Sequence, residues 1–180
     1  MKVIALVGLS GVGKSTLLKK LSDQIEFEHL QASALIKSEL KRTQAEIKNS
    51  EGLRQGQVID NQTALVNGFL RATKGMSGLF VLDGHTLIDA GEKLIEIPAD
   101  VFRQIGVEHM VFLQDDPQKI AERREADRNR KRPKRTVETL VNHQAQAITV
   151  AARITLELDI PLSVISSSQH EMLRMCLNLY

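Results

Sequence analysis

The feature that most constrains the fold of this chain is a phosphate-binding motif at residues 8–15. The segment GLSGVGKS matches G-x-x-x-x-G-K-[ST] at every fixed position. The apolar run from Lys2 to Val7 precedes it and is typical of a strand buried in a parallel sheet. Leucines 17, 18 and 21 follow at helical spacing, so a helix is expected from Lys14. This strand–loop–helix context indicates that the glycine-rich turn binds an anion.

The turn and the helix that follows it predict a site for ATP and Mg²⁺. Backbone N–H groups of the loop and the N-terminal end of the helix point at the same anion. We expect Lys14 to reach the β- and γ-phosphates and the Ser15 hydroxyl to hold Mg²⁺. The expected nucleotide-binding residues of this segment are Gly8, Ser10, Gly11, Val12, Gly13, Lys14, Ser15 and Thr16.

Asp83 is the second residue expected at the metal. It follows the apolar run Leu79–Leu82, so it lies at the carboxyl edge of the predicted sheet, where ligands bind in open α/β folds. A carboxylate at this edge suits Mg²⁺ opposite Ser15. The alternative is a turn or helix-capping aspartate, because Asp-Gly is a common turn pair.

Strands and helices alternate along the chain, which predicts an α/β three-layer fold with a parallel sheet of about five strands and helices on both faces. The stretch around Pro98 is less regular, and residues 49–56 are expected to form a loop. The 180 residues correspond to roughly one domain. Further strands are expected at 27–31, 79–82, 108–113 and 161–166, and helices at 33–47, 58–71, from 117, at 136–152 and at 169–177.

Composition narrows the setting of the protein. No apolar run approaches the roughly 18 residues of a membrane span, and the N-terminal apolar run is too short for a signal peptide. The single cysteine, Cys176, excludes an intramolecular disulfide and a multi-cysteine metal site. We therefore expect a cytoplasmic protein that does not bind a membrane.

Residues 119–135 form a basic segment with nine Lys or Arg and three Asp or Glu. Guanidinium groups that close over a migrating phosphoryl group stabilise its charge and exclude water, so a catalytic lid is the favoured interpretation. An RNA or ribosome contact and a merely solvated face are the alternatives. Aromatic residues make up only 3% of the chain, so we do not expect a surface that stacks single-stranded nucleic acid.

Several segments, taken in order, resemble the adenylate kinase family of nucleoside monophosphate kinases, the archaeal type in particular. Only the phosphate-binding motif is specific by itself, and the order of the others adds weight. The matching segments are HLQASALIK at 29–37, FVLDG at 80–84, IAERR at 120–124, RNR at 128–130 and His143-Gln144.

The resemblance implies a P-loop kinase with a short arginine-rich lid that transfers the γ-phosphoryl group of ATP to a second phosphate. Residues of about 29–73 would form the substrate-binding helices, and residues of about 119–135 the lid. The implied roles are catalysis for Lys14, Arg123 and Arg128, nucleotide binding for Arg124 and Arg130, and substrate binding for Lys37, Asp83, His85 and Thr86.

The chain departs from the family pattern where the family binds the acceptor phosphate. Lys37, Leu87 and Ile148 stand where the family has arginines. This puts AMP in doubt as the acceptor and leaves the ATP half of the site undisturbed. His85 could instead belong to a hydrogen-bonded turn; if the acceptor were a hydroxyl, Asp83 or His85 would be the candidate base.

Two functional hypotheses remain at this point. The first is a kinase for a nucleoside monophosphate or a related small acceptor. The second is an ATPase of the same fold that acts as an assembly or regulatory factor with a protein or RNA partner, which the missing clamps and the basic lid favour. A GTPase is disfavoured because no N-K-x-D motif occurs, and an ABC or AAA+ motor is disfavoured by the size of the chain.

Overall fold

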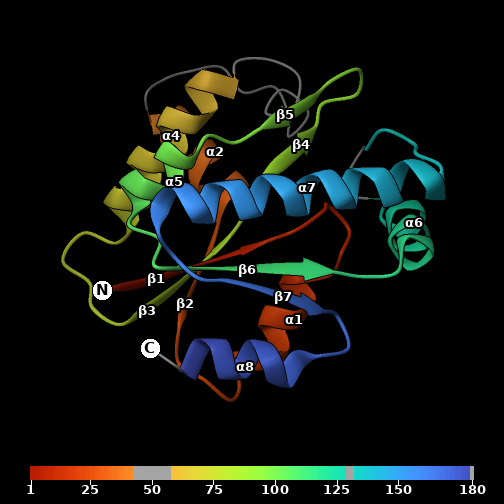
Figure 1. Cartoon of the computed structure of the whole chain (residues 1–180). Helices are drawn as coiled ribbons and strands as arrows, with labels where there is room; N and C mark the ends of the chain where they lie inside the picture. The colour runs from red at the N-terminus through yellow and green to blue at the C-terminus, as the bar shows by residue number, and fades with distance from the viewer. Residues whose placement is uncertain (43–57, 129–131, 179–180) are drawn as a thin grey trace.

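The computed structural model describes residues 1–42, 58–128 and 132–178, the first three residues of the second range by their backbone only. Its centre is a parallel sheet of five strands, as the sequence predicts (Figure 1). The strand order is β2 (Glu28–Gln31), β3 (Leu79–Asp83), β1 (Lys2–Val7), β6 (His109–Gln114) and β7 (Leu162–Ser166).

The central strands are buried because their sequences are apolar on both faces. Val3 to Val7 of β1 are each at most 1% exposed, and Met110 to Leu113 of β6 are fully buried. Continuous apolar runs of this kind fit a parallel sheet that is covered on both sides. The core therefore sits on both faces of β1, β3 and β6.

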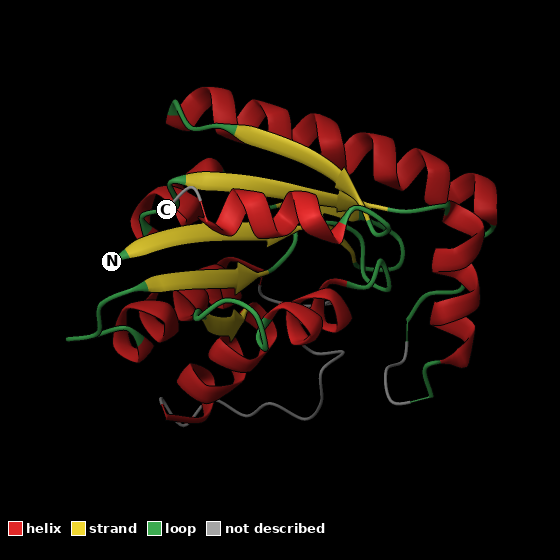
Figure 2. Cartoon of the chain, turned by 90° about the horizontal axis from the view of Figure 1, so that it is seen from below, coloured by secondary structure: helices red, strands yellow, loops and turns green. Residues whose placement is uncertain are grey.

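Helices cover the two faces of the sheet (Figures 1 and 2). In Figure 1, α7 lies along the upper face with α2, α4 and α5, whereas α1 and α8 lie on the opposite face. The seven helices of the described residues are α1 (Lys14–Leu21), α2 (Ala32–Arg42), α4 (Val58–Ala72), α5 (Ala99–Ile105), α6 (Pro117–Ala126), α7 (Val137–Leu158) and α8 (His170–Asn178). None of the described helices is both long enough and apolar enough to cross a membrane.

Two helix starts follow directly from capping residues in the sequence. The Asp116 side chain accepts a hydrogen bond from the Gln118 N–H, and Pro117 occupies the first position of α6. The Thr136 hydroxyl accepts from the Thr139 N–H at the start of α7, 3.1 Å away. Both starts were predicted, and together they bracket the basic segment.

The irregular stretch around Pro98 contains structure that the sequence analysis did not predict. Strands β4 (Leu87–Asp89) and β5 (Leu94–Glu96) form an antiparallel hairpin, and α5 follows directly. Each of these strands has three residues, which is too short to show an alternating pattern. The predicted loop at 49–56 and the end of the predicted helix at 43–47 lie outside the described residues.

The sheet topology sets the position of the site. All five strands run in parallel, so their carboxyl ends meet at one edge. The register pairs Asp83 of β3 with Leu6 of β1 on one side and with Gln31 of β2 on the other. The loop between β1 and α1 therefore begins beside Asp83, and α6 lies beyond the same edge in Figure 2.

Candidate active site

The phosphate-binding loop at 8–13 requires glycine at two positions for different reasons. Gly13 has φ 108°, a left-handed conformation that side chains rarely adopt. A Cβ on Gly8 would lie 2.3 Å from the Leu113 carbonyl oxygen, because the loop passes directly over the end of β6. The loop is thus held against the sheet edge, with Lys14 as the first residue of α1.

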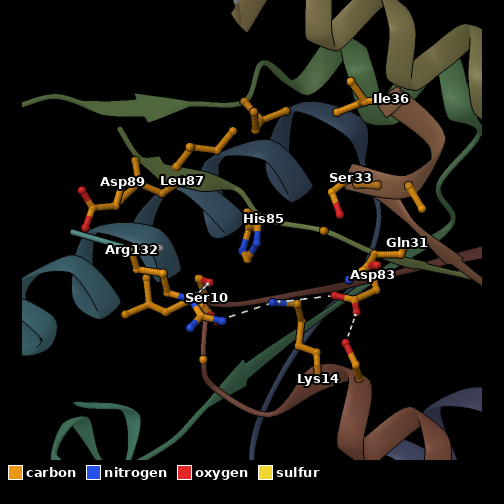
Figure 3. Close-up of a pocket in the computed structure, with 18 of the residues that line it drawn as sticks. Ser10, Lys14, Gln31, Ser33, Ile36, Asp83, His85, Leu87, Asp89 and Arg132 are labelled. Atoms are coloured by element: carbon orange, nitrogen blue, oxygen red, sulfur yellow. Dashed lines mark hydrogen bonds and ion pairs between the residues drawn. The ribbon is translucent and has the colours of Figure 1, made fainter. Parts of the chain in front are cut away.

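Lys14, Ser15 and Asp83 come together as the sequence predicts. Figure 3 shows the Lys14 side chain reaching toward Asp83. The buried Lys14 ammonium donates to the Gly8 carbonyl at 3.2 Å and lies 3.7 Å from Asp83 Oδ1. The Ser15 hydroxyl donates to Asp83 Oδ2 at 2.9 Å. A cation and a carboxylate thus face each other at the mouth of the loop.

Asp83 is held in its ionised form. Burial raises the pKa of its carboxyl, but the hydrogen bond with His29 and the charge of Lys14 outweigh burial and lower the pKa to about 2. His29 Nε2 lies 3.4 Å from Asp83 Oδ2. His29 was not singled out from the sequence; it pairs with Val81 of β3, two residues before Asp83, and its ring reaches the Asp83 carboxylate from there.

The donor atoms beside the loop fit Mg²⁺. Mg²⁺ prefers oxygen ligands and is usually bound by one or two protein oxygens together with phosphates and water. The Ser15 hydroxyl and the ionised Asp83 carboxylate supply such oxygens side by side. The described residues contain no cluster of three or more His, Cys, Asp or Glu that would form a metal cage without substrate.

His85 lies at the centre of the site. Its Nδ1 donates to the Gly8 carbonyl at 2.6 Å, since a carbonyl oxygen can only accept. The ring is half-buried and lines the cavity, as the sequence analysis proposed. Thr86, by contrast, is 1% exposed, and its hydroxyl donates to the Ala147 carbonyl of α7. Thr86 does not line the cavity, because this bond directs its side chain from the bend before β4 into the contact with α7.

Two predicted arginines of α6 contact the phosphate-binding loop directly. Arg123 donates to the Val12 carbonyl at 3.0 Å and forms an ion pair of 2.6 Å with Asp115. Arg124 donates to the Ser10 carbonyl at 2.8 Å. Both line the cavity. The basic segment therefore closes over the loop.

The other two predicted arginines of this segment are not brought to the loop. Arg128 is exposed and does not line the cavity, since it follows the end of α6. Arg130 lies outside the described residues.

Arg132 is the functional residue that the sequence analysis left without a role. Its side chain is only 6% exposed. Its Nε donates to the Ser10 hydroxyl at 2.9 Å, and one terminal nitrogen pairs with Asp127 at 2.6 Å. The other terminal nitrogen is buried and has no hydrogen-bond partner among the described residues. The arginine run was a signal for this group, but spacing alone could not single out Arg132.

One cavity of about 680 Å³ joins these groups to a second compartment. The loop, Arg123, Arg124 and Arg132 form one end, and residues of α2, α4, α5 and the β4–β5 hairpin form the other. Figure 3 shows His85 between Ser10 and Arg132 on one side and Ser33 and Ile36 on the other. Lys37 lines the cavity from an exposed position on α2.

A second polar network holds the C-terminal end of the basic segment in place. Arg135 donates to both carboxylate oxygens of Asp89, at 2.8 and 3.0 Å, and so ties the segment to the hairpin. His143 is buried 3.8 Å from Asp89, and burial lowers the pKa of its ring. Gln144 bonds to the backbone of Asp115 in both directions. Neither His143 nor Gln144 lines the cavity, so the structure places them in the scaffold.

The fold and the loop define the class: a P-loop nucleotide-binding domain with the kinase type of sheet. A family model described as an AAA domain matches residues 7–141, and the chain belongs to that family of P-loop domains. A shikimate kinase from Bacteroides thetaiotaomicron has a similar structure, with a TM-score of 0.53, 16% identity, and coverage of 90% of this chain and 86% of that one. No curated protein matches the chain significantly. The predicted fold class, a P-loop kinase fold with a parallel sheet of five strands, is confirmed.

Proposed function

We propose that this protein is an ATP-dependent phosphotransferase that transfers the γ-phosphoryl group to a nucleoside monophosphate or a related small acceptor. The observation that carries the proposal is the single cavity that joins the phosphate-binding loop to a second compartment. A P-loop ATPase needs only the first end of such a cavity. A kinase needs both, because donor and acceptor must meet in line.

The residues at the loop supply charge and position. On this proposal, Lys14 leaves the Gly8 carbonyl for the β- and γ-phosphates of ATP. Three arginines donate to acceptors of the loop in the structure: Arg123 to the Val12 carbonyl, Arg124 to the Ser10 carbonyl and Arg132 to the Ser10 hydroxyl. When ATP binds, its phosphate oxygens would replace these acceptors. This exchange of acceptors favours ATP binding electrostatically, since a guanidinium forms stronger hydrogen bonds with a phosphate than with a carbonyl.

Mg²⁺ would be held by Ser15 and Asp83 and would neutralise charge on the β- and γ-phosphates. The low pKa of Asp83 keeps its carboxylate ionised for this role. The same property makes Asp83 a weak base, so we assign it to binding and not to proton removal.

The proposal extends to the setting of the reaction. We place the whole chain in one catalytic domain, with residues 119–135 as the lid. A buried free thiol at Cys176 suits the reducing cytoplasm. The sequence resemblance implies adenylate kinase activity of the archaeal type, but Lys37, Leu87 and Ile148 replace the family's arginines, so the finer proposal is a related small acceptor in place of AMP.

The shikimate kinase neighbour supports a small-molecule acceptor through its fold alone, since its identity to this chain is 16%. Its name says that it acts on shikimate, which is a small molecule. The alternative function is an ATPase that works with a protein or RNA partner. The exposed Arg128, within the lid segment, favours that alternative, because a partner could reach it.

One experiment separates the two functions. The protein is incubated with ATP and Mg²⁺, with and without a panel of small acceptors, and ADP is measured by chromatography. We expect ADP formation to depend on the acceptor. Slow ADP formation that no acceptor changes, or that RNA stimulates, would favour the ATPase.

A further inference from the structure

We propose that the second compartment accepts an uncharged, nucleoside-sized alcohol rather than a phosphate. This proposal rests on the kinase function above and narrows its acceptor. The two ends of the cavity differ in chemistry: guanidinium groups gather at the phosphate-binding loop, whereas apolar and amide side chains surround the acceptor end.

The charges are unevenly distributed along the cavity. Arg123, Arg124 and Arg132 all contact loop residues 10–12, at the donor end. Around the acceptor end, the part of the chain that the structure describes contributes a single basic residue, Lys37. Its side chain is exposed on α2, so water screens its charge.

Leu87 is part of the wall of the acceptor end. It is 5% exposed and lines the cavity from the start of β4 (Figure 3). The next residues of the wall, Leu65 of α4 and Phe102 of α5, are also buried and apolar. Removing a phosphate dianion from water into such a wall is costly unless opposite charges and donors replace the water.

Apart from Lys37 and Asp89, whose carboxylate is paired with Arg135, the polar side chains of the acceptor end are neutral. Asn61 and Gln62 reach the cavity from α4, Gln31 from the end of β2 and Ser33 from α2. Amides and hydroxyls can both donate and accept hydrogen bonds, which suits the hydroxyl and ring groups of an uncharged molecule. A site built to hydrogen-bond such groups discriminates strongly against ligands that leave them unpaired.

The reaction balances without a further reactant. The acceptor oxygen forms a bond to Pγ, and the bond from Pγ to the bridging oxygen breaks, with its electron pair remaining on ADP. The hydroxyl proton moves to a non-bridging oxygen of the transferred group. The products are ADP and a phosphate monoester.

Binding of matched pairs tests the proposal. Calorimetry with a saturating non-hydrolysable ATP analogue and Mg²⁺ compares adenosine, guanosine, cytidine and thymidine with their own 5′-monophosphates. For at least one pair, we expect the nucleoside to bind about tenfold or more tightly than the monophosphate and to support ADP formation from ATP.

Two results would overturn the proposal. In the first result, the monophosphate binds at least as tightly as its nucleoside in every pair for which binding is detected. In the other, no member of any pair binds although the ATP analogue does. Failure of the ATP analogue itself to bind is a different result, which overturns the proposed kinase function.

Two variants place the effect in the acceptor end. Leu87→Arg places a guanidinium group at the acceptor end and should improve monophosphate binding by about tenfold. The control Leu156→Arg, at a side chain that is 83% exposed, should leave monophosphate binding unchanged.

Gln62→Leu should weaken nucleoside binding and leave binding of the ATP analogue unchanged. Thr63→Leu, the exposed neighbour on α4, is its control. Equal effects of a variant and its control would contradict the assignment.

Discussion

At the scale of single residues, Lys14 has the clearest role, because its ammonium lies buried between the loop carbonyls and Asp83. Lys14→Ala should abolish ATP-dependent phosphorylation and should weaken ATP binding, since no other ammonium of the described chain lines the donor end. Lys19→Ala, at an exposed position on the same helix, is the control. Steady-state kinetics of both variants check this, and normal turnover of Lys14→Ala would refute the role.

Arg123 should act mainly in the transition state. Its guanidinium is tied to Val12 and Asp115 and reaches the loop from α6, where the migrating charge develops. Arg123→Ala should lower kcat by about 100-fold and raise KM for ATP by much less. Arg103→Ala, at a half-exposed position on α5, should change neither constant. An unchanged kcat for Arg123→Ala would remove Arg123 from the chemistry.

How much of the site could be predicted differs from residue to residue. The sequence predicts Lys14, Ser15 and Asp83 together because a motif and the end of an apolar strand fix their positions. Arg132 was not predicted, since a loop conformation buries it, and no periodicity describes that loop. Thr86 was expected at the substrate, but the bend between β3 and β4 turns its side chain toward α7, where it bonds to the Ala147 carbonyl.

At the scale of secondary structure elements, the contact between α2 and α4 is the most sensitive to side-chain size. A Cβ on Gly68 would lie 2.9 Å from the Leu35 carbonyl oxygen. The overpacking cost of about 1 to 3 kcal/mol outweighs the helix-propensity gain of about 1 kcal/mol, so Gly68→Ala should destabilise the protein by up to about 2 kcal/mol. Asn67→Ala, at the exposed neighbouring position, should not. Thermal unfolding measures both, and a higher Tm for Gly68→Ala would contradict this packing.

The same two helices are joined by a buried carboxylate. Glu39 of α2 accepts hydrogen bonds from Arg42 and from Arg71 of α4, which lower its pKa to about 2. The folded state thus binds fewer protons than the unfolded state, whose carboxyl has the ordinary value of 4.5. The stability that Glu39 contributes is complete above pH 4.5 and is lost as the pH falls through about 2.

Glu39→Gln should therefore flatten the decrease of unfolding free energy between pH 4.5 and about 2. It should also lower stability at neutral pH, since the amide cannot pair with both guanidinium groups. Denaturant unfolding at a series of pH values measures the effect, with the exposed Glu26→Gln as control. An unchanged slope for Glu39→Gln would show that the carboxylate is not stabilised by its partners.

The predictability of the elements follows from their length and their caps. Strands β1, β3 and β6 and helices α6 and α7 were predicted because each has a long apolar pattern or a capping side chain. The β4–β5 hairpin was not, since its strands are held by pairing and by the Asp89–Arg135 ion pair instead of a local pattern. That hairpin forms part of the acceptor end of the cavity, so the sequence predicts the residues of the donor end better than those of the acceptor end.

At the scale of the whole molecule, the strand order brings residues far apart in sequence to one edge. Ser15, Asp83 and Arg123 belong to α1, β3 and α6, and the parallel sheet gathers them at its carboxyl edge. The order of the motifs was enough to predict this fold. The identity of the acceptor was not predictable, because it depends on cavity walls that several short elements build together.

Calorimetric titration of the folded protein with ATP and Mg²⁺ is the most direct measurement of the central claim that residues 8–15 bind a triphosphate. The account predicts a saturable heat at a stoichiometry of about one nucleotide per chain, which Lys14→Ala reduces strongly. No heat at millimolar nucleotide, from protein shown to be folded, would contradict it.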